Sequence, residues 1–437
     1  MHKEVRICGI AERFSSSVRP TIPTLLCKYH PINRNRINTL SSPNVLSKKL
    51  IVLLAVASAL GPTAMQILLP ALPVIQDTFI VSDGIAQLTL SLSMLAIALG
   101  TLYYGPLSDK YGRKPVMLIG LCITFAGSLA CLFADSIEFL ILGRFIQAFG
   151  GAVGLVLARA IVRDVYEAND AARVIATLVM VMVVIPMLSP ALGGELMARF
   201  GWQFVFSIVA GFSVVLFAVM LYLLPETLKE SAPFEGISSM LSTYGLLLQS
   251  VTFRSYALCG AFVSVVFFSF VAAAPEIMVS AFNRPPTDYG YYFIMIPLGF
   301  MGGNYTTRML TQRFSINQLI SLGGSIALLG IIAALAFQML GNSHPLALFV
   351  PVAIAVFGNG ITLPNAQAAA INEFPQYAGS ASGLTGFLQM ALSAAAAQAV
   401  AWIYNGTAFP LLFMMLCASV LSLGLFHFGI KSQLRPV

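Results

Sequence analysis

Charged side chains are scarce in this sequence: Asp, Glu, Lys and Arg make up 9% of the 437 residues, whereas 58% of the residues are hydrophobic. A soluble domain carries about a quarter charged residues. The low charge and the mean hydropathy of +0.86 therefore exclude a soluble globular protein and indicate an integral membrane protein. The short alternating segments of an outer-membrane barrel are also missing. Because backbone polar groups must be paired inside lipid, we expect the membrane-spanning segments to be helices.

The sequence also has few groups suited to catalysis or metal binding. Its four histidines are scattered and do not have metal-ligand spacing. There is no P-loop pattern, so ATP does not drive this chain directly. The six cysteines do not make a disulfide framework, and four of them lie in apolar segments as small hydrophobic residues. We expect a chain that is not an enzyme and that needs no cofactor and no metal.

Twelve apolar segments follow one another from Lys48 onward. Each is long enough to cross a bilayer as a helix, which needs about 20 residues. The loops are short except between the sixth and seventh segments, where a surface helix is expected near 236–249. We therefore expect an all-α membrane protein with twelve transmembrane helices in two six-helix halves. The segments are 50–75, 84–104, 115–134, 138–162, 171–198, 202–224, 255–281, 287–308, 316–340, 345–371, 378–403 and 407–429.

The long loop divides the chain into parts. We expect a polar, basic and disordered tail over 1–47, an N-terminal half over 48–224, a cytoplasmic linker over 225–254, a C-terminal half over 255–430 and a cytoplasmic tail over 431–437. The N-terminal tail has no continuous apolar core, which excludes a secretory signal peptide.

Basic residues are distributed unevenly. Nine of the 24 Lys and Arg precede residue 50, and most of the others lie in loops on the same side of the membrane. Such an excess marks the cytoplasmic side, so we expect both termini in the cytoplasm. The net charge of +7 then reflects membrane topology and does not indicate nucleic-acid binding.

The loop after the second segment fits the pattern G-x-x-x-D-[RK]-x-G-R-[RK] at every specified position. Its glycines permit close approach and turn geometry, and its acid stands at helical i, i+4 spacing from a base. A topology signal made of bases alone would explain neither the acid nor the glycines. The pattern resembles the loop between the second and third helices of major facilitator superfamily transporters, and the matching residues are Gly105, Asp109, Lys110, Gly112, Arg113 and Lys114.

Four further segments extend this resemblance to about residues 48–430. Together they resemble the twelve-span drug:proton antiporters, most closely the bicyclomycin- and chloramphenicol-resistance-like branch. The segments are Leu68–Pro73 (L-L-P-A-L-P), Gly143–Gly151 with Arg144 and Gln147, the stretch from Pro186 through Ser189, Pro190, Gly193 and Gly194, and Leu224–Leu228 (L-P-E-T-L).

The resemblance implies a role for each motif. The loop after the second segment would latch the two halves in the outward-facing state. A base at the depth of Arg144 costs about 3 kcal/mol and needs a partner or a cavity. The resemblance implies that Arg144 faces the central cavity and takes part in proton transfer. A structural ion pair or carbonyl contact is the alternative for Arg144. The fifth segment would form the seam between the halves that marks antiporters, although a generic kinked helix would also carry such prolines and glycines.

One family feature is missing. Where these antiporters often carry an acid in the first segment, this sequence has Gln66, which cannot carry a proton. Coupling then needs another carboxylate, or the protein is not a proton antiporter of the usual kind. Glu276 and Glu195 are our proton-coupling candidates with Arg144, because a carboxylate in a low-dielectric site can bind and release a proton near neutral pH.

We expect a multidrug exporter that exchanges small amphipathic drugs for protons by alternating access, acting as a monomer in a bacterial inner membrane. A transporter of a defined metabolite is the alternative, and a non-transporting receptor or membrane enzyme is a third class. Residues expected to line the substrate cavity come from segments that should face it: Met65, Gln66, Gln147, Met187, Phe267, Tyr291, Asn359 and Gln389.

Overall fold

The computed structural model describes residues 48–433 except 167, 229–235, 312 and 343. The expectation for the tail over 1–47 therefore lies outside the described residues. Within the described part, every regular element is a helix, and eleven helices are long and apolar enough to cross a membrane. The predicted all-α membrane fold is confirmed.

Six of the expected segments, and the surface helix expected near 236–249, occur close to their predicted limits. In the first part of the chain the helices are α1 (Lys48–Gln66), η2 (Leu69–Ala71), α2 (Leu72–Phe79), α3 (Asp83–Tyr111), α4 (Arg113–Leu132), α5 (Ile137–Val165), α6 (Ala168–Phe200) and α7 (Phe204–Leu223). The surface helix is α8 (Gly236–Gln249).

The second part of the chain supplies the other six segments. Its helices are α9 (Val251–Ser280), α10 (Pro286–Phe293), α11 (Met295–Leu310), α12 (Ile316–Met339), α13 (Leu346–Glu373), η3 (Pro375–Tyr377), α14 (Ala378–Trp402) and α15 (Phe409–Gln433). The expected eighth segment, 287–308, is thus divided between α10 and α11, so neither piece alone is long enough to count among the eleven.

Proline explains both places where an expected segment is broken. A proline ring clashes with the carbonyl four residues before it and donates no hydrogen bond to that carbonyl. Four residues before Pro70 is Gln66, where α1 ends, and four residues before Pro297 is Phe293, where α10 ends. The Thr63 carbonyl still accepts from the Ile67 N–H at 2.9 Å, but the break after α1 leaves the later carbonyls without helix partners.

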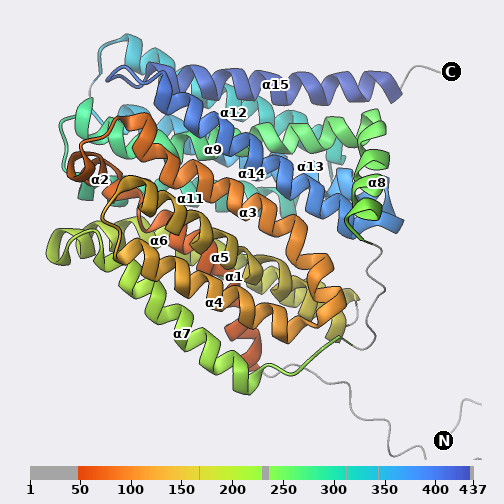
Figure 1. The fold of residues 1–437 in the computed structure, drawn as a ribbon. Helices are drawn as coiled ribbons and strands as arrows, with labels where there is room; N and C mark the ends of the chain where they lie inside the picture. The colour runs from red at the N-terminus through yellow and green to blue at the C-terminus, as the bar shows by residue number, and fades with distance from the viewer. Residues whose placement is uncertain (1–47, 167, 229–235, 312, 343, 434–437) are drawn as a thin grey trace, which may run out of the picture. The chain divides into compact units, whose positions relative to one another are not determined.

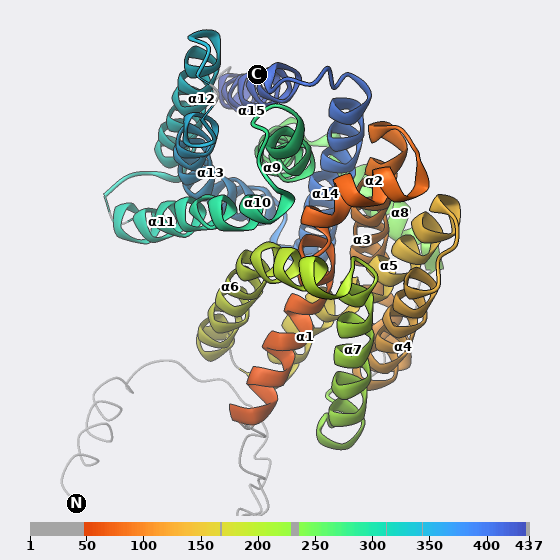
Figure 2. The same cartoon turned by 90° about the vertical axis from the view of Figure 1, so that its left-hand side faces the viewer.

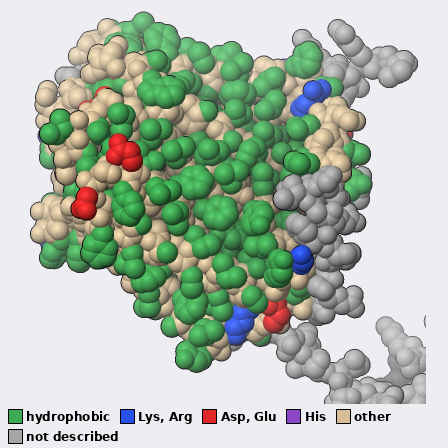
Figure 3. All heavy atoms as spheres, viewed as in Figure 1, with side chains coloured by type: hydrophobic (Ala, Val, Ile, Leu, Met, Phe, Trp, Pro, Cys, Tyr) green, Lys and Arg blue, Asp and Glu red, His purple; other side chains and the backbone are tan. Residues whose placement is uncertain are grey.

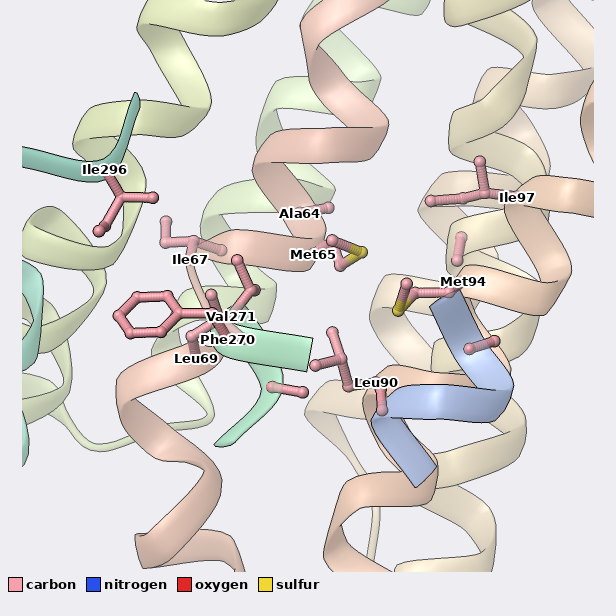
Figure 4. Packing of buried hydrophobic residues seen from close by; sticks show 14 of the residues in the cluster. Ala64, Met65, Ile67, Leu69, Leu90, Met94, Ile97, Phe270, Val271 and Ile296 are labelled. Carbon is pink, nitrogen blue, oxygen red and sulfur yellow. The ribbon is translucent and has the colours of Figure 1, made fainter. Parts of the chain in front are cut away.

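Helices α1–α7 pack mainly on one another, as do α9–α15 (Figure 1). We call these two groups the N-terminal and C-terminal halves. Large contacts between them join α3 to α14 and α6 to α10 (Figure 2). The two halves share one hydrophobic cluster, to which α1, α3, α9 and α11 contribute side chains such as Met65, Met94, Phe270 and Ile296 (Figure 4).

Charged side chains gather at the two ends of the bundle, and the visible face between them is mostly hydrophobic (Figure 3). Following the charge-based orientation, we call the end with the α2–α3 and α9–α10 connections the outer end and the end with α8 the inner end. Cross-half hydrogen bonds occur at the outer end: Gln398 Nε2 donates to the Gly84 carbonyl at 2.8 Å, and Ser91 Oγ donates to Gln398 Oε1 at 2.6 Å. We call the α3–α14 and α6–α10 contacts at this end the outer seam.

Candidate functional site

The loop after α3 turns at Gly112. This residue has φ +98°, in the left-handed region, and ends α3 while α4 begins at the next residue. A Cβ at Gly112 would lie 2.5 Å from Glu226 Oε2. Both the backbone conformation and the close carboxylate therefore require glycine here.

Arg113 is buried at the centre of a partly exposed polar cluster. Its side chain forms ion pairs with Asp109 at 2.5 Å and with Asp164, at the inner end of α5, at 2.8 Å. It also donates to Ser108 Oγ at 2.6 Å. The i, i+4 pairing with Asp109 matches the spacing noted in the sequence. Asp164 was missed, because it lies 51 residues away and no sequence pattern connects the two.

Glu226 caps the N-terminus of α4. Its carboxylate accepts hydrogen bonds from the backbone N–H groups of Arg113 at 2.9 Å and Lys114 at 3.2 Å, and also from Thr227 and Leu228. Partial burial acts to raise the pKa of Glu226, but the four backbone hydrogen bonds outweigh it and lower the pKa. Glu226 belongs to the L-P-E-T-L segment noted in the sequence, but its capping role was not predicted.

Every partner described above belongs to the N-terminal half or to the start of the linker. A Cβ at Gly105 would have no neighbour within 4 Å, and Lys110 stacks over its own neighbour, Tyr111, at 4.8 Å from the ring centroid. In this conformation the described contacts of the loop tie α3, α4, α5 and the start of the linker together. The role of the loop as a latch between halves stays a prediction.

Arg144 is buried inside the N-terminal half, with 1% of its surface exposed. One terminal nitrogen donates to the Ala64 carbonyl at 3.0 Å and to Gln147 Oε1 at 2.5 Å, and Gln147 in turn donates to Ser128 Oγ at 2.8 Å. Its Nε has no hydrogen-bond partner, and none of the ion pairs between described residues includes Arg144.

The end of α1 compensates part of the charge of Arg144. Ala64 contributes one of the last four carbonyls of α1, and the C-terminal end of a helix carries about half a negative charge. Phe206 adds an aromatic ring 6.0 Å from the guanidinium. Gln66, at the last position of α1, is buried and its Oε1 has no partner.

The proline- and glycine-rich stretch of α6 lies where α6 meets both α1 and α10. A Cβ at Gly193 would lie 2.0 Å from the Ile67 carbonyl oxygen, and one at Gly194 would lie 3.3 Å from Thr287 of α10. From the other side, a Cβ at Gly290 of α10 would lie 2.5 Å from the Ala191 Cα. Ser189 stays compact, because its hydroxyl donates to the Ile185 carbonyl at 2.9 Å.

Glu195 and Tyr291 connect the two halves at the same seam. The Tyr291 hydroxyl donates to Glu195 Oε1 at 2.7 Å, and Arg199 pairs with the same carboxylate at 3.3 Å. Tyr291 is 55% exposed at the outer end. The structure therefore brings a proton-coupling candidate and a cavity candidate together on the outer seam.

Glu276 lines a small hollow between the halves at the outer end, with a cavity volume of about 30 Å³. Asp83 and Gln87 of α3 face the same hollow, together with Gln76 of α2 and Tyr404, which follows α14. The sequence did not connect Asp83 with Glu276, because almost two hundred residues separate them.

The other cavity candidates lie in different surroundings. Met65 and Met187 are buried, and Phe267 is partly buried against the shared hydrophobic cluster. Asn359 donates to the Val263 carbonyl at 3.5 Å, and Gln389 accepts from Gln367 at 3.2 Å, so both amides bond within the C-terminal half.

Comparisons with known proteins agree with this architecture. A sequence model described as the Major Facilitator Superfamily matches residues 54–398. A bicyclomycin resistance protein homolog of Haemophilus influenzae is 28% identical over 396 residues, covering 88% of this chain and 97% of that protein. Multidrug resistance protein D of Escherichia coli K12 is 28% identical over 347 residues, covering 78% of this chain and 85% of that protein. Among solved structures, a D-xylose–proton symporter aligns with a TM-score of 0.69 at 12% identity, over 85% of this chain and 96% of the other.

Proposed function

Since the chain belongs to the Major Facilitator Superfamily of membrane transporters, we propose that it is a secondary active exporter that exchanges small amphipathic drugs for protons. Relatives named for bicyclomycin and multidrug resistance support this substrate class. The bacterial relatives also support a place in a bacterial inner membrane, with both termini on the cytoplasmic side. We propose that the monomer is the working unit.

The observation that carries the proposal is the packing of the α6 stretch at the seam between the halves. Across the seam, a Cβ at Gly290 of α10 would lie 2.5 Å from the Ala191 Cα of this stretch, and one at Gly194 would lie 3.3 Å from Thr287; within the N-terminal half, a Cβ at Gly193 would lie 2.0 Å from the Ile67 carbonyl oxygen. Close packing of small residues is how membrane helices seal against one another. A seal at this position prevents a leak while the halves rock, which antiport against a gradient requires.

The polar groups support alternating access in exchange for protons. The halves meet at the outer end, whereas a Cβ added at Gly105 in the inner loop would meet nothing within 4 Å, so we interpret this arrangement as inward-facing. Inward movement of a proton yields about 2.3 kcal/mol per 100 mV in addition to the pH gradient. Buried Arg144 supports a role in proton coupling, because its unpartnered Nε is a free donor that would stabilise the charged form of a carboxylate brought next to it.

The adaptable side chains Met65, Met187 and Phe267 suit a site that accepts drugs of different shape. The test is accumulation of a fluorescent lipophilic drug in cells that express the wild type, Arg144→Ala or Arg284→Ala at matched levels, with and without a protonophore. Arg284 is an exposed outer-end base and serves as the matched control.

We expect low accumulation in cells with the wild type and Arg284→Ala, and high accumulation with Arg144→Ala or with the protonophore. Equal accumulation in every condition would contradict export of that drug.

One observation favours a second candidate, transport of a defined anionic metabolite. Because Gln66 stands where related antiporters often carry an acid, no described carboxylate pairs with Arg144. A substrate carboxylate would then supply the missing charge. Competition by only a narrow set of anions in a transport assay would favour this candidate over a drug exporter.

A further inference from the structure

The hollow between Asp83 and Glu276 is formed jointly by the two halves. The N-terminal half contributes Gln76, Asp83 and Gln87, and the C-terminal half contributes Glu276 and Tyr404. It therefore exists in this form only while the outer seam is closed. Its volume of about 30 Å³ is enough for one or two water molecules.

Gln87 provides an independent sign that the hollow holds a ligand. Its side chain is 6% exposed and lines the hollow, yet its Nε2 has no hydrogen-bond partner. An unmade hydrogen bond in a buried position costs about 1–3 kcal/mol. An amide donor accepts a water molecule as partner more readily than a metal cation, because cations need oxygen ligands.

The remaining polar groups around the hollow have partners on its rim. Gln76 donates to Asp83, the Tyr404 and Ser280 hydroxyls are hydrogen-bonded to each other, and Ser280 donates to the Glu276 carbonyl at 2.8 Å. Burial raises the pKa of Tyr404 to about 12, so this hydroxyl stays neutral at physiological pH.

Only negative charge faces Glu276. Asp83 on α3 lines the same hollow and Asp77 on α2 lies nearby, while the described residues that line the hollow from α9 and α14 include no base. Two ionised carboxylates in one small space repel each other, and a single shared proton removes that repulsion. Closing the outer seam brings the two carboxylates together.

We propose that the closed outer seam holds one proton, shared between Asp83 and Glu276 through a water molecule bound by Gln87. The proton is taken from the outer side as the seam closes and returns to the outer side when the seam opens, so the site responds to external pH and moves no net proton. Acid outside the cell therefore favours closure, which is the step by which an exporter returns to the inward-facing state. The direction of this cycle, in which closure of the outer seam is the return step, rests on the proposed exchange of drugs for protons.

The test measures closure directly. Spin labels are placed on cysteines introduced at Phe133 and Met339, two exposed residues at the outer ends of the N-terminal and C-terminal halves, after the native cysteines have been replaced. Distances between the labels are measured in purified full-length protein from pH 5 to 9, without substrate. The variants are Glu276→Gln and Asp83→Asn, with Glu138→Gln and Asp135→Asn as outer-end controls away from the hollow.

One linked proton changes the closed-to-open ratio by up to tenfold per pH unit. We expect this response in the wild type and both controls, and a nearly flat, mostly closed population in Glu276→Gln and Asp83→Asn. An unchanged pH response in both hollow variants would overturn the proposal. So would closure that follows sodium concentration from 0 to about 150 mM at fixed pH, because a metal ion would then be the ligand.

Drug efflux from proteoliposomes, measured with the same preparations, shows whether a negative result concerns the proton site or the proposed export of drugs. Efflux by the wild type together with an unchanged pH response in the hollow variants contradicts the proton site alone. No efflux by the wild type contradicts the proposed function, and the distance measurements then still decide whether the hollow binds a proton.

Discussion

Replacing Gly290 by alanine tests how closely the outer seam is packed. The added Cβ would lie 2.5 Å from the Cα and 2.7 Å from the N of Ala191, and 3.0 Å from the carbonyl carbon of Pro190. All three atoms are backbone atoms of α6, so no side-chain rotation can relieve the overlap. Ordinary contact needs about 1 Å more separation between α10 and α6, and only a shift of the helices can supply it.

Overpacking of this kind typically costs about 1–3 kcal/mol. The cost falls on the closed seam alone, because α10 and α6 belong to different halves and separate when the seam opens. Since 1.36 kcal/mol corresponds to a factor of ten, the closed-to-open ratio should fall about 5- to 150-fold. The gain in helix propensity from glycine to alanine, about 1 kcal/mol, acts on both states and cancels in this ratio.

The assay is the distance distribution between spin labels at Phe133 and Met339. The matched control is Gly211→Ala in α7, where an added Cβ meets nothing within 4 Å. We expect Gly290→Ala to shift the population toward the open outer seam and Gly211→Ala to leave it unchanged. A distribution for Gly290→Ala that matches the wild type would refute the argument from close packing.

Three further predictions concern the N-terminal half. Glu226→Gln should lower stability by about 1 kcal/mol at neutral pH, because a carboxylate at a helix N-terminus is stabilising. Because the pKa of Glu226 is lowered in the folded state, the ionised carboxylate stabilises the fold above the ordinary pKa of a glutamate, and this stabilisation is lost as the pH falls through the lowered folded-state pKa. The thermal unfolding midpoints of the wild type and Glu226→Gln should therefore converge in acid. Arg113→Gln and Asp164→Asn should show a coupling energy of about 1–3 kcal/mol in a double-mutant unfolding cycle, and strict additivity would contradict their ion pair. Arg144→Met should raise the unfolding midpoint and abolish efflux, because it removes a buried charge that lacks a carboxylate partner; a lower midpoint would show that the α1 carbonyls compensate the charge fully.

Much of the fold could be predicted from the sequence because lipid imposes simple requirements. Continuous apolar segments located the helices, and the i, i+4 spacing of Asp109 and Arg113 correctly indicated a local pair. The break between α10 and α11 was not predicted, although Pro297 was visible, because other helices such as α3 continue through a proline.

The parts of the site that were missed depend on contacts between distant segments. Asp164 and Glu226 reach Arg113 from 51 and 113 residues away, and no periodicity relates such positions. Asp83 and Glu276 share a hollow only because two halves meet. The depth of Arg144 in the membrane could be predicted from its position within an apolar segment. Its hydrogen-bond acceptor could not be predicted, because that acceptor is the backbone carbonyl of Ala64 and every residue has a backbone carbonyl.

The break at Pro70 has an electrostatic consequence. An unbroken first helix would engage the Ala64 carbonyl internally, and the buried guanidinium of Arg144 would lose its closest oxygen outside its own helix. A residue without charge thus helps to hold a charged side chain that is distant in sequence. Any motion that straightens the first membrane segment would weaken this hydrogen bond, so the shape of the main chain and the position of the Arg144 guanidinium are linked.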